Sequence, residues 1–129
     1  MSKQSTYTIS DLSKHFELTP RTIRFYESEG LLTPKRDNGK RIYGEGDLVR
    51  LKLILRGKRL GFSLGEIKTT MELYDTQLNE AAQLNFVLQT IETHRSELIV
   101  KQQDIVKTLD EMETVAKRVR GKLKALDDD

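Results

Sequence analysis

The chain of 129 residues contains no cysteine and no tryptophan, and it has only two histidines. The absence of cysteine excludes thiolate metal sites, redox-switch thiols and cysteine nucleophiles. His15 and His94 are accompanied by no carboxylate cluster with the spacing of metal ligands, and no glycine-rich nucleotide-binding motif occurs. We therefore expect no enzyme activity, no cofactor and no metal ion.

Long apolar runs are also absent. No stretch approaches the length of a membrane span, and the N-terminus has no secretory signal pattern. Hydrophobic residues make up 36% of the chain and charged residues 33%, a balance that indicates much solvated helix surface. We expect a cytoplasmic protein without membrane contact, consisting of one small domain and an extension.

The positive charge is concentrated in the first half of the chain. Residues 1–68 hold 14 Lys and Arg against 8 Asp and Glu, whereas residues 69–129 hold 8 against 12. The two halves therefore carry net charges of +6 and −4. This asymmetry indicates that only the first half meets a polyanion. Scattered solvated lysines are the simpler explanation for the positive charge, but they do not predict the break.

Two short helices with a tight turn between them are predicted near the N-terminus. Thr8 is a predicted N-cap of residues 9–17, and Thr19 with Pro20 marks the start of a second helix that ends at Gly30. This is the helix-turn-helix pattern, although many small helical domains contain such a pair. In the second helix, Arg21 and Arg24 share one face. With Tyr26 beside them, they suggest contact with DNA.

A positively charged hairpin and two more helices follow. Asn38-Gly39 is a strong signal for a two-residue hairpin turn, and basic residues flank it on both sides. The apolar pattern predicts a third helix over residues 47–60, with Gly61 just past its end. Its inward residues are Leu48, Leu51, Leu55 and Ile54. A capping box from Ser63 to Glu66 starts a fourth helix, over residues 64–74.

After a polar connector over residues 75–82, one long periodic helix is predicted from Leu84 onward. Apolar residues occupy every d position of six heptads when Leu84 is labelled d. Such a narrow stripe indicates a coiled coil with a partner helix, although the helix could instead fold back on its own domain. Arg95 at an a position would face its own copy in a parallel dimer, which favours antiparallel pairing. We predict that dimerisation depends on Leu84, Leu88, Ile91, Leu98, Ile105, Leu109 and Met112.

These motifs together resemble the MerR family of bacterial transcription regulators. The resemblance is carried by residues 19–27, Gly30-Leu31-Leu32, Arg41-Ile42-Tyr43 and residues 59–67. It implies a mainly α fold with a winged helix-turn-helix DNA-binding domain over residues 1–75. The connector and an antiparallel coiled-coil dimerisation helix with an acidic tail then occupy residues 76–129. Residues 49–64 in particular resemble the subgroup that controls branched-chain amino acid (leucine and isovalerate) and fatty acid catabolism.

The resemblance also implies a function, namely that a homodimer binds an inverted-repeat operator in double-stranded DNA and acts on RNA polymerase indirectly, as activator or repressor. The second helix would enter the major groove, the hairpin would be the wing, and the end of the third helix would touch phosphate. Carried over by position, the DNA-binding residues are Arg21, Arg24, Tyr26, Lys35, Arg36, Arg41, Tyr43 and Lys58. An acyl-CoA is the effector that the subgroup suggests. The alternatives are a ligand-independent DNA-binding protein and a coiled-coil interaction protein that docks an acidic partner.

Overall fold

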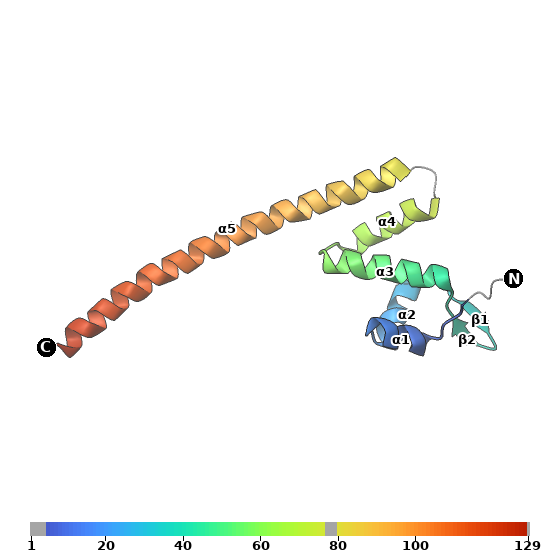
Figure 1. Ribbon diagram of the computed structural model, residues 1–129, viewed down its shortest axis with the longest axis horizontal. Coiled ribbons are helices and arrows are strands. Elements are labelled where there is room, and N and C mark those ends of the chain that lie inside the picture. Colours follow the sequence, from blue (N-terminus) through green and yellow to red (C-terminus); the bar gives the residue numbers. More distant parts are fainter. Residues whose placement is uncertain (1–4, 77–79, 129) are drawn as a thin grey trace. The chain divides into compact units, whose positions relative to one another are not determined.

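The computed structural model describes residues 5–76 and 80–128, which form five helices and one hairpin within these ranges (Figure 1). The elements in chain order are α1 (Ile9–Phe16), α2 (Pro20–Ser28), β1 (Lys35–Asp37), β2 (Lys40–Ile42), α3 (Glu45–Arg59), α4 (Leu64–Thr76) and α5 (Glu80–Asp127). The expected mainly α fold, with a winged helix-turn-helix followed by a long C-terminal helix, is confirmed. The chain divides into two compact units, with the boundary after Thr90.

The two helices of the helix-turn-helix begin at the predicted caps. The Thr8 hydroxyl accepts a hydrogen bond from the Asp11 N–H at 3.0 Å, and the Asp11 carboxylate accepts one from the Thr8 N–H at 2.9 Å. The Thr19 hydroxyl accepts from the Thr22 N–H at 3.1 Å. Glu17 ends α1 in the left-handed region with φ 56°, which lets the chain turn within three residues. Local chemistry therefore fixes where α2 begins.

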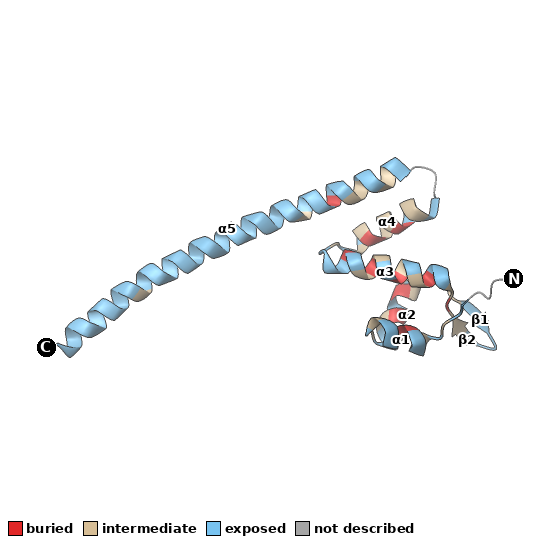
Figure 2. Cartoon of the chain, viewed as in Figure 1, coloured by how far each residue is buried: buried red, intermediate tan, exposed pale blue. Residues whose placement is uncertain are grey.

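The core of the first unit lies between α1, α2, α3 and α4, where the buried positions gather (Figure 2). Leu51 and Ile54 are fully buried on α3, whereas the predicted Leu48 and Leu55 are half-buried and pack against the core. Burying one such aliphatic side chain stabilises the fold by about 1.5–3 kcal/mol. The buried apolar residues are Leu12, Ile23, Tyr26, Leu31, Leu32, Tyr43, Leu51, Ile54, Ile67 and Met71.

Helix α3 starts two residues before the predicted Asp47. Gly44 is its extended N-cap residue, and the Gly44 N–H donates to the Asp47 carboxylate at 3.3 Å. This is half of a capping box, because glycine has no side chain to return the bond. The helix therefore begins at Glu45.

The junction between α3 and α4 is a Schellman motif followed by a capping box. Gly61 adopts φ 87°, and the Phe62 N–H donates to the Gly57 carbonyl at 2.9 Å. Ser63 and Glu66 then exchange backbone-to-side-chain bonds of 2.8 and 3.1 Å, as the sequence predicts. The two helices are thus joined by a short connection of defined geometry.

The long helix starts earlier than the apolar pattern indicates. The predicted connector over residues 75–82 is shorter, since α4 continues to Thr76 and α5 begins at Glu80. Residues 77–79 lie outside the described residues, as do residues 1–4 and Asp129 of the expected acidic tail. Val87 lines an apolar cavity with α3 and α4, and Thr90 is buried. The first turns of α5 therefore belong to the first unit, unlike the expected division after residue 75.

The apolar stripe of α5 is largely exposed among the described residues. Its predicted a and d residues are 37% to 61% exposed, and the helix is almost entirely pale blue in Figure 2. These residues are Leu84, Leu88, Ile91, Leu98, Ile105, Leu109 and Met112. A stripe of this length needs a partner helix to leave water. Among the described residues, no helix is long and apolar enough to cross a membrane.

Candidate nucleic-acid interface

Helix α2 has one buried face and one exposed basic face. Ile23 and Tyr26 point into the core, while Arg21 and Arg24 are exposed. Neither arginine forms an ion pair or hydrogen bond with another described residue. Phe25 is 46% exposed beside Arg24 and was not singled out as a contact by sequence reasoning. The helix thus offers two guanidinium groups and one aromatic ring to the solvent.

Two predicted DNA contacts do not reach the surface. Tyr26 is 2% exposed and Tyr43 is 0% exposed, so the expectation that they are presented to DNA is wrong. Tyr26 lies three residues after Ile23 and therefore on the same buried helix face. Both hydroxyl groups are buried without a hydrogen-bond partner among the described residues. Burial raises the pKa of Tyr43, and the nearby Glu27 carboxylate raises it further.

The wing is the antiparallel pair of β1 and β2. Asn38 and Gly39 adopt φ values of 51° and 79°, as a type I′ hairpin turn requires, which confirms the predicted hairpin. In the strand register, Arg36 lies directly opposite Arg41. Lys35 and Arg36 are exposed and Arg41 is half-buried. The wing therefore carries its predicted basic residues, but not all of them face solvent.

The N-terminal segment supports the wing, and sequence reasoning missed this contact. Tyr7 and Tyr43 exchange two backbone hydrogen bonds of 2.8 Å. The Tyr7 hydroxyl also donates to Glu45 at 2.7 Å, and this bond raises the pKa of Tyr7. A two-stranded ribbon is marginal in water, so these bonds help to hold it against α3.

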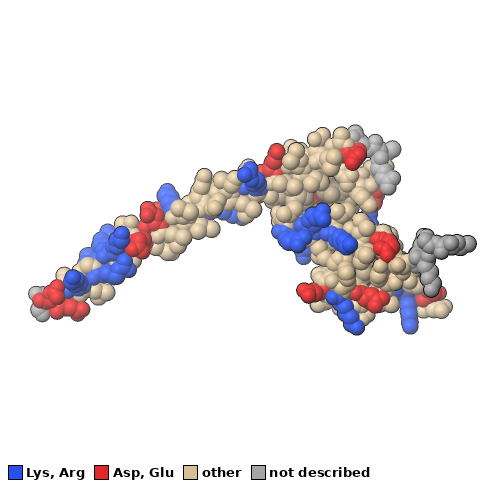
Figure 3. All heavy atoms as spheres, in the orientation of Figure 1, with Lys and Arg blue, Asp and Glu red and all other residues tan. Residues whose placement is uncertain are grey.

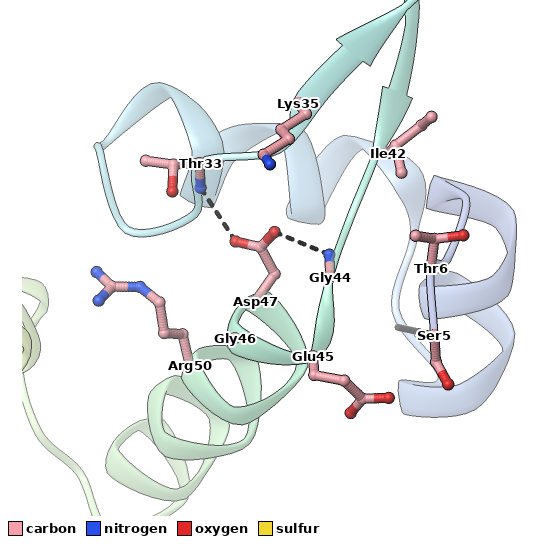
Figure 4. A pocket seen from close by; sticks show the side chains of 10 residues that line it. All are labelled: Ser5, Thr6, Thr33, Lys35, Ile42, Gly44, Glu45, Gly46, Asp47 and Arg50. Carbon is pink, nitrogen blue, oxygen red and sulfur yellow. Dashed lines mark hydrogen bonds between the residues drawn. The ribbon is translucent and has the colours of Figure 1, made fainter. Parts of the chain in front are cut away.

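A buried carboxylate ties the base of the wing to the start of α3 (Figure 4). The Asp47 side chain is pointed between two backbone segments and accepts hydrogen bonds from Thr33 N–H at 3.2 Å and Gly44 N–H at 3.3 Å. Arg50, one turn further along α3, donates from Nε to the Leu31 carbonyl at 2.7 Å. These contacts fix the chain on both sides of the wing. They border an open hollow of about 540 Å³.

The last turn of α3 carries a third basic group. Arg56, Lys58 and Arg59 occupy this turn, and Figure 3 shows blue side chains gathered over the end of α3. Lys58 is exposed and forms no ion pair with another described residue. It is placed where the resemblance predicts a phosphate contact. The same cations also complement the negative end of the helix dipole.

The described residues contain no group of three or more His, Cys, Asp or Glu side chains that could hold a metal ion. Several of their carboxylates form ion pairs within the fold, for example Glu29 with Lys68 at 2.5 Å and Asp75 with Arg50. These two ion pairs join α4 to the end of α2 and to α3. They contribute to the arrangement of the helices.

Helix-turn-helix, basic wing and long C-terminal helix define the class of winged helix-turn-helix proteins. The family model described as "MerR HTH family regulatory protein" matches residues 7–73, and the model "MerR, DNA binding" matches residues 48–115. The chain belongs to the MerR family. The resemblance found in the motifs is thereby confirmed at the level of the family.

Individual relatives give the same assignment. The chain is 31% identical to the transcriptional regulator HmrR of Rhizobium leguminosarum bv. viciae over 105 residues, which cover 81% of each chain. It is 41% identical to ZntR of Escherichia coli K12 over 69 residues, 52% of this chain and about half (49%) of that relative's length. Among solved structures, HiNmlR, a MerR family regulator bound to promoter DNA, matches with a TM-score of 0.63 and 26% identity over 80% of each chain.

Proposed function

We propose that this chain is a sequence-specific transcription regulator that binds operator DNA in the cytoplasm. The main observation behind this proposal is that Arg21 and Arg24 are both exposed on α2, in a helix-turn-helix flanked by a basic wing. The family membership and the likeness to a regulator bound to promoter DNA support the proposal. An arginine on such a helix can donate two hydrogen bonds to the major-groove edge of guanine.

The basic residues outside α2 fit a second role, which is binding to the DNA backbone irrespective of the base sequence. Lys35 and Arg36 on the wing and Lys58 at the end of α3 are exposed cations. Cations in such positions bind phosphate oxygens and release counterions, so the affinity they supply falls as salt rises. The proposal therefore assigns base recognition to α2 and backbone contacts to the wing and α3.

The regulator acts as a homodimer in this proposal. The exposed a and d residues of α5 support it, because pairing with a second copy would remove this stripe from water. An antiparallel pair avoids stacking Arg95 on its own copy. Two α2 helices related by two-fold symmetry then match an inverted-repeat operator.

Arg24→Ala tests the assignment of base recognition. If Arg24 reads a base, the variant loses about 1–3 kcal/mol of operator binding while its affinity for random duplex DNA changes little. Lys117→Ala, which removes an exposed cation of α5, is the matched control and keeps full operator affinity. Equal losses on both DNAs would make Arg24 a phosphate contact instead.

A coiled-coil interaction protein that docks an acidic partner is the rival function. Footprinting of the DNA upstream of its own gene separates the two, because the rival protects no inverted repeat. If α5 folds back on its own unit rather than pairing, sedimentation finds a monomer, and the homodimer part of the proposal fails.

The effector and the regulated genes form the finer part of the proposal. The resemblance of residues 49–64 to the regulators of branched-chain and fatty acid catabolism supports an acyl-CoA effector, with RNA polymerase affected indirectly at the promoter. An apolar cavity of about 110 Å³ bordered by Leu60, Phe62 and Met71 has the size of a short alkyl group, and Arg56 lies at its edge. Isovaleryl-CoA should raise the melting temperature where free CoA does not. Equal melting temperatures with both compounds would argue for a ligand-independent regulator.

A further inference from the structure

Glu27 on α2 is the one acidic group of this helix that faces the wing in the described structure. Its carboxylate lies 2.5 Å from Nε of Arg41 and 3.9 Å from Nη2 of Arg36. The Glu27 side chain is only 22% exposed, so solvent screens these interactions incompletely. One carboxylate therefore connects the DNA-reading helix to both strands of the hairpin.

The strand register explains why this carboxylate is needed. Arg36 and Arg41 are directly opposite each other in the ladder, and like charges in that arrangement destabilise a strand pair. Each strand has only three residues, too few to hold a ribbon in one place without external contacts. A negative charge next to both guanidinium groups offsets their repulsion and fixes the ribbon against α2.

The two arginines are not equivalent. Arg41 is 27% exposed and makes a short charge-assisted hydrogen bond to Glu27. Arg36 is 54% exposed, lies beyond hydrogen-bond distance from Glu27, and donates to the Gly39 carbonyl at 3.2 Å. Exchanging the weak contact of Arg36 for a phosphate costs little, whereas extracting Arg41 would leave a partly buried carboxylate unpaired.

We propose that Glu27 is a positioning residue that sets the wing at a fixed distance from the base-reading arginines, with Arg41 as its permanent partner and Arg36 as the arginine released to DNA phosphate. This inference rests on the proposed DNA-binding function. Glu27 follows Arg24 by three residues, so both lie on neighbouring turns of α2. A wing held at Glu27 can make its phosphate contacts at the same time as Arg24 makes its base contact. The two sets of contacts then form together only on the operator, which raises operator affinity relative to random DNA.

The experiment measures binding of Glu27→Gln to the footprinted operator and to random duplex DNA over a range of salt concentrations. Random-DNA affinity is expected to stay equal or rise, because a negative charge is removed near phosphate. Operator affinity is expected to fall, so that the ratio of the two drops about tenfold, the scale of one base contact. Glu29→Gln is the matched control: Glu29 lies on the same helix end but pairs with Lys68 of α4, and the ratio should not change.

Two arginine variants separate positioning from simple attraction. Arg36→Gln should reduce the slope of log affinity against log salt by about one phosphate contact, whereas Arg41→Gln should leave the slope unchanged. Arg41→Gln should instead lower the ratio of operator to random-DNA affinity, as Glu27→Gln does. Because Glu27 and Arg41 act as one pair, the variant that carries both changes should lower this ratio no further than either single variant. Thermal unfolding confirms that each variant is folded at the temperature of the binding assay.

An unchanged ratio in Glu27→Gln, or equal salt slopes for the two arginine variants, would overturn the inference while the wild-type protein still protects its operator. Failure of the wild-type protein to protect any inverted repeat would instead overturn the proposed function on which the inference rests. The two failures are therefore distinguishable in the same set of measurements.

Discussion

The Asp47→Ala variant should unfold at a clearly lower urea concentration than the wild-type protein. The Asp47 side chain is buried, at 8% exposure, and accepts two backbone N–H groups at 3.2 and 3.3 Å. A hydrogen bond to a charged group contributes about 1.5–3 kcal/mol, and bonds this long belong at the lower end. We therefore expect a loss of about 2–3 kcal/mol in the free energy of unfolding.

The open hollow beside Asp47 keeps the loss from being larger. Water can enter it and bind the N–H groups of Thr33 and Gly44 after the carboxylate is gone. Asp47→Asn keeps one carbonyl oxygen but turns an amide NH₂ toward the second N–H, so its loss should be about half as large, on the order of 1–2 kcal/mol.

Urea unfolding followed by circular dichroism at one protein concentration measures these losses, since the stability of the proposed homodimer would depend on concentration. With a slope of roughly 1–3 kcal/mol per molar urea, the Asp47→Ala midpoint should fall by about 0.7–3 M. Asp37→Ala is the matched control, because Asp37 is an exposed wing carboxylate and should change stability by less than about 0.5 kcal/mol. If the two variants unfolded at the same urea concentration, the structural role given to Asp47 would be refuted.

Two further predictions concern α5 and the core. Ile105→Asp puts a charge at a d position and should yield monomers by sedimentation; Val100→Asp, equally apolar but on the far side of the helix, should stay dimeric. Tyr43→Phe removes a buried hydroxyl that has no hydrogen-bond partner among the described residues, so the free energy of unfolding should change by less than about 1 kcal/mol at neutral pH. Burial raises the pKa of Tyr43, so the contribution of this group to the free energy of unfolding is fully present below a pH of about 10 and is lost as pH rises through the folded pKa. The stability of Tyr43→Phe should therefore fall less at high pH than that of the wild-type protein.

The parts of the fold that depend on neighbouring residues could be predicted from the sequence. Thr8 and Thr19 cap their helices, Asn38-Gly39 forms the hairpin turn, and Gly61 ends α3, because each feature requires only a few adjacent residues. The long helix α5 could be predicted for a similar reason, since its apolar period repeats over six heptads. The family motifs then predicted the order of a winged helix-turn-helix and a long C-terminal helix.

The errors arise where contacts come from distant segments. Tyr26 was predicted to be exposed beside Arg24, but the helix period places it with Ile23, and that face is buried in a core to which other helices contribute. The Tyr43 side chain is buried in the core, and its backbone pairs with that of Tyr7, 36 residues earlier in the chain. No local sequence pattern predicts the ion pair between Glu27 and Arg41 of the wing, because these residues are 14 positions apart and lie in different elements.

Contacts of the acidic residues bear directly on the charge asymmetry of the chain. In the described part of residues 1–76, most carboxylates are engaged within the fold, where they cap helices, bind backbone N–H groups or pair with arginine and lysine. The exposed cations Arg21, Arg24, Lys35 and Lys58 have no such partner among the described residues. Most of these acids therefore hold the structure together, while Arg21 and Arg24 of α2, Lys35 of the wing and Lys58 of α3 face solvent. Scattered solvated lysines would not produce this division, whereas a surface that binds a polyanion requires it.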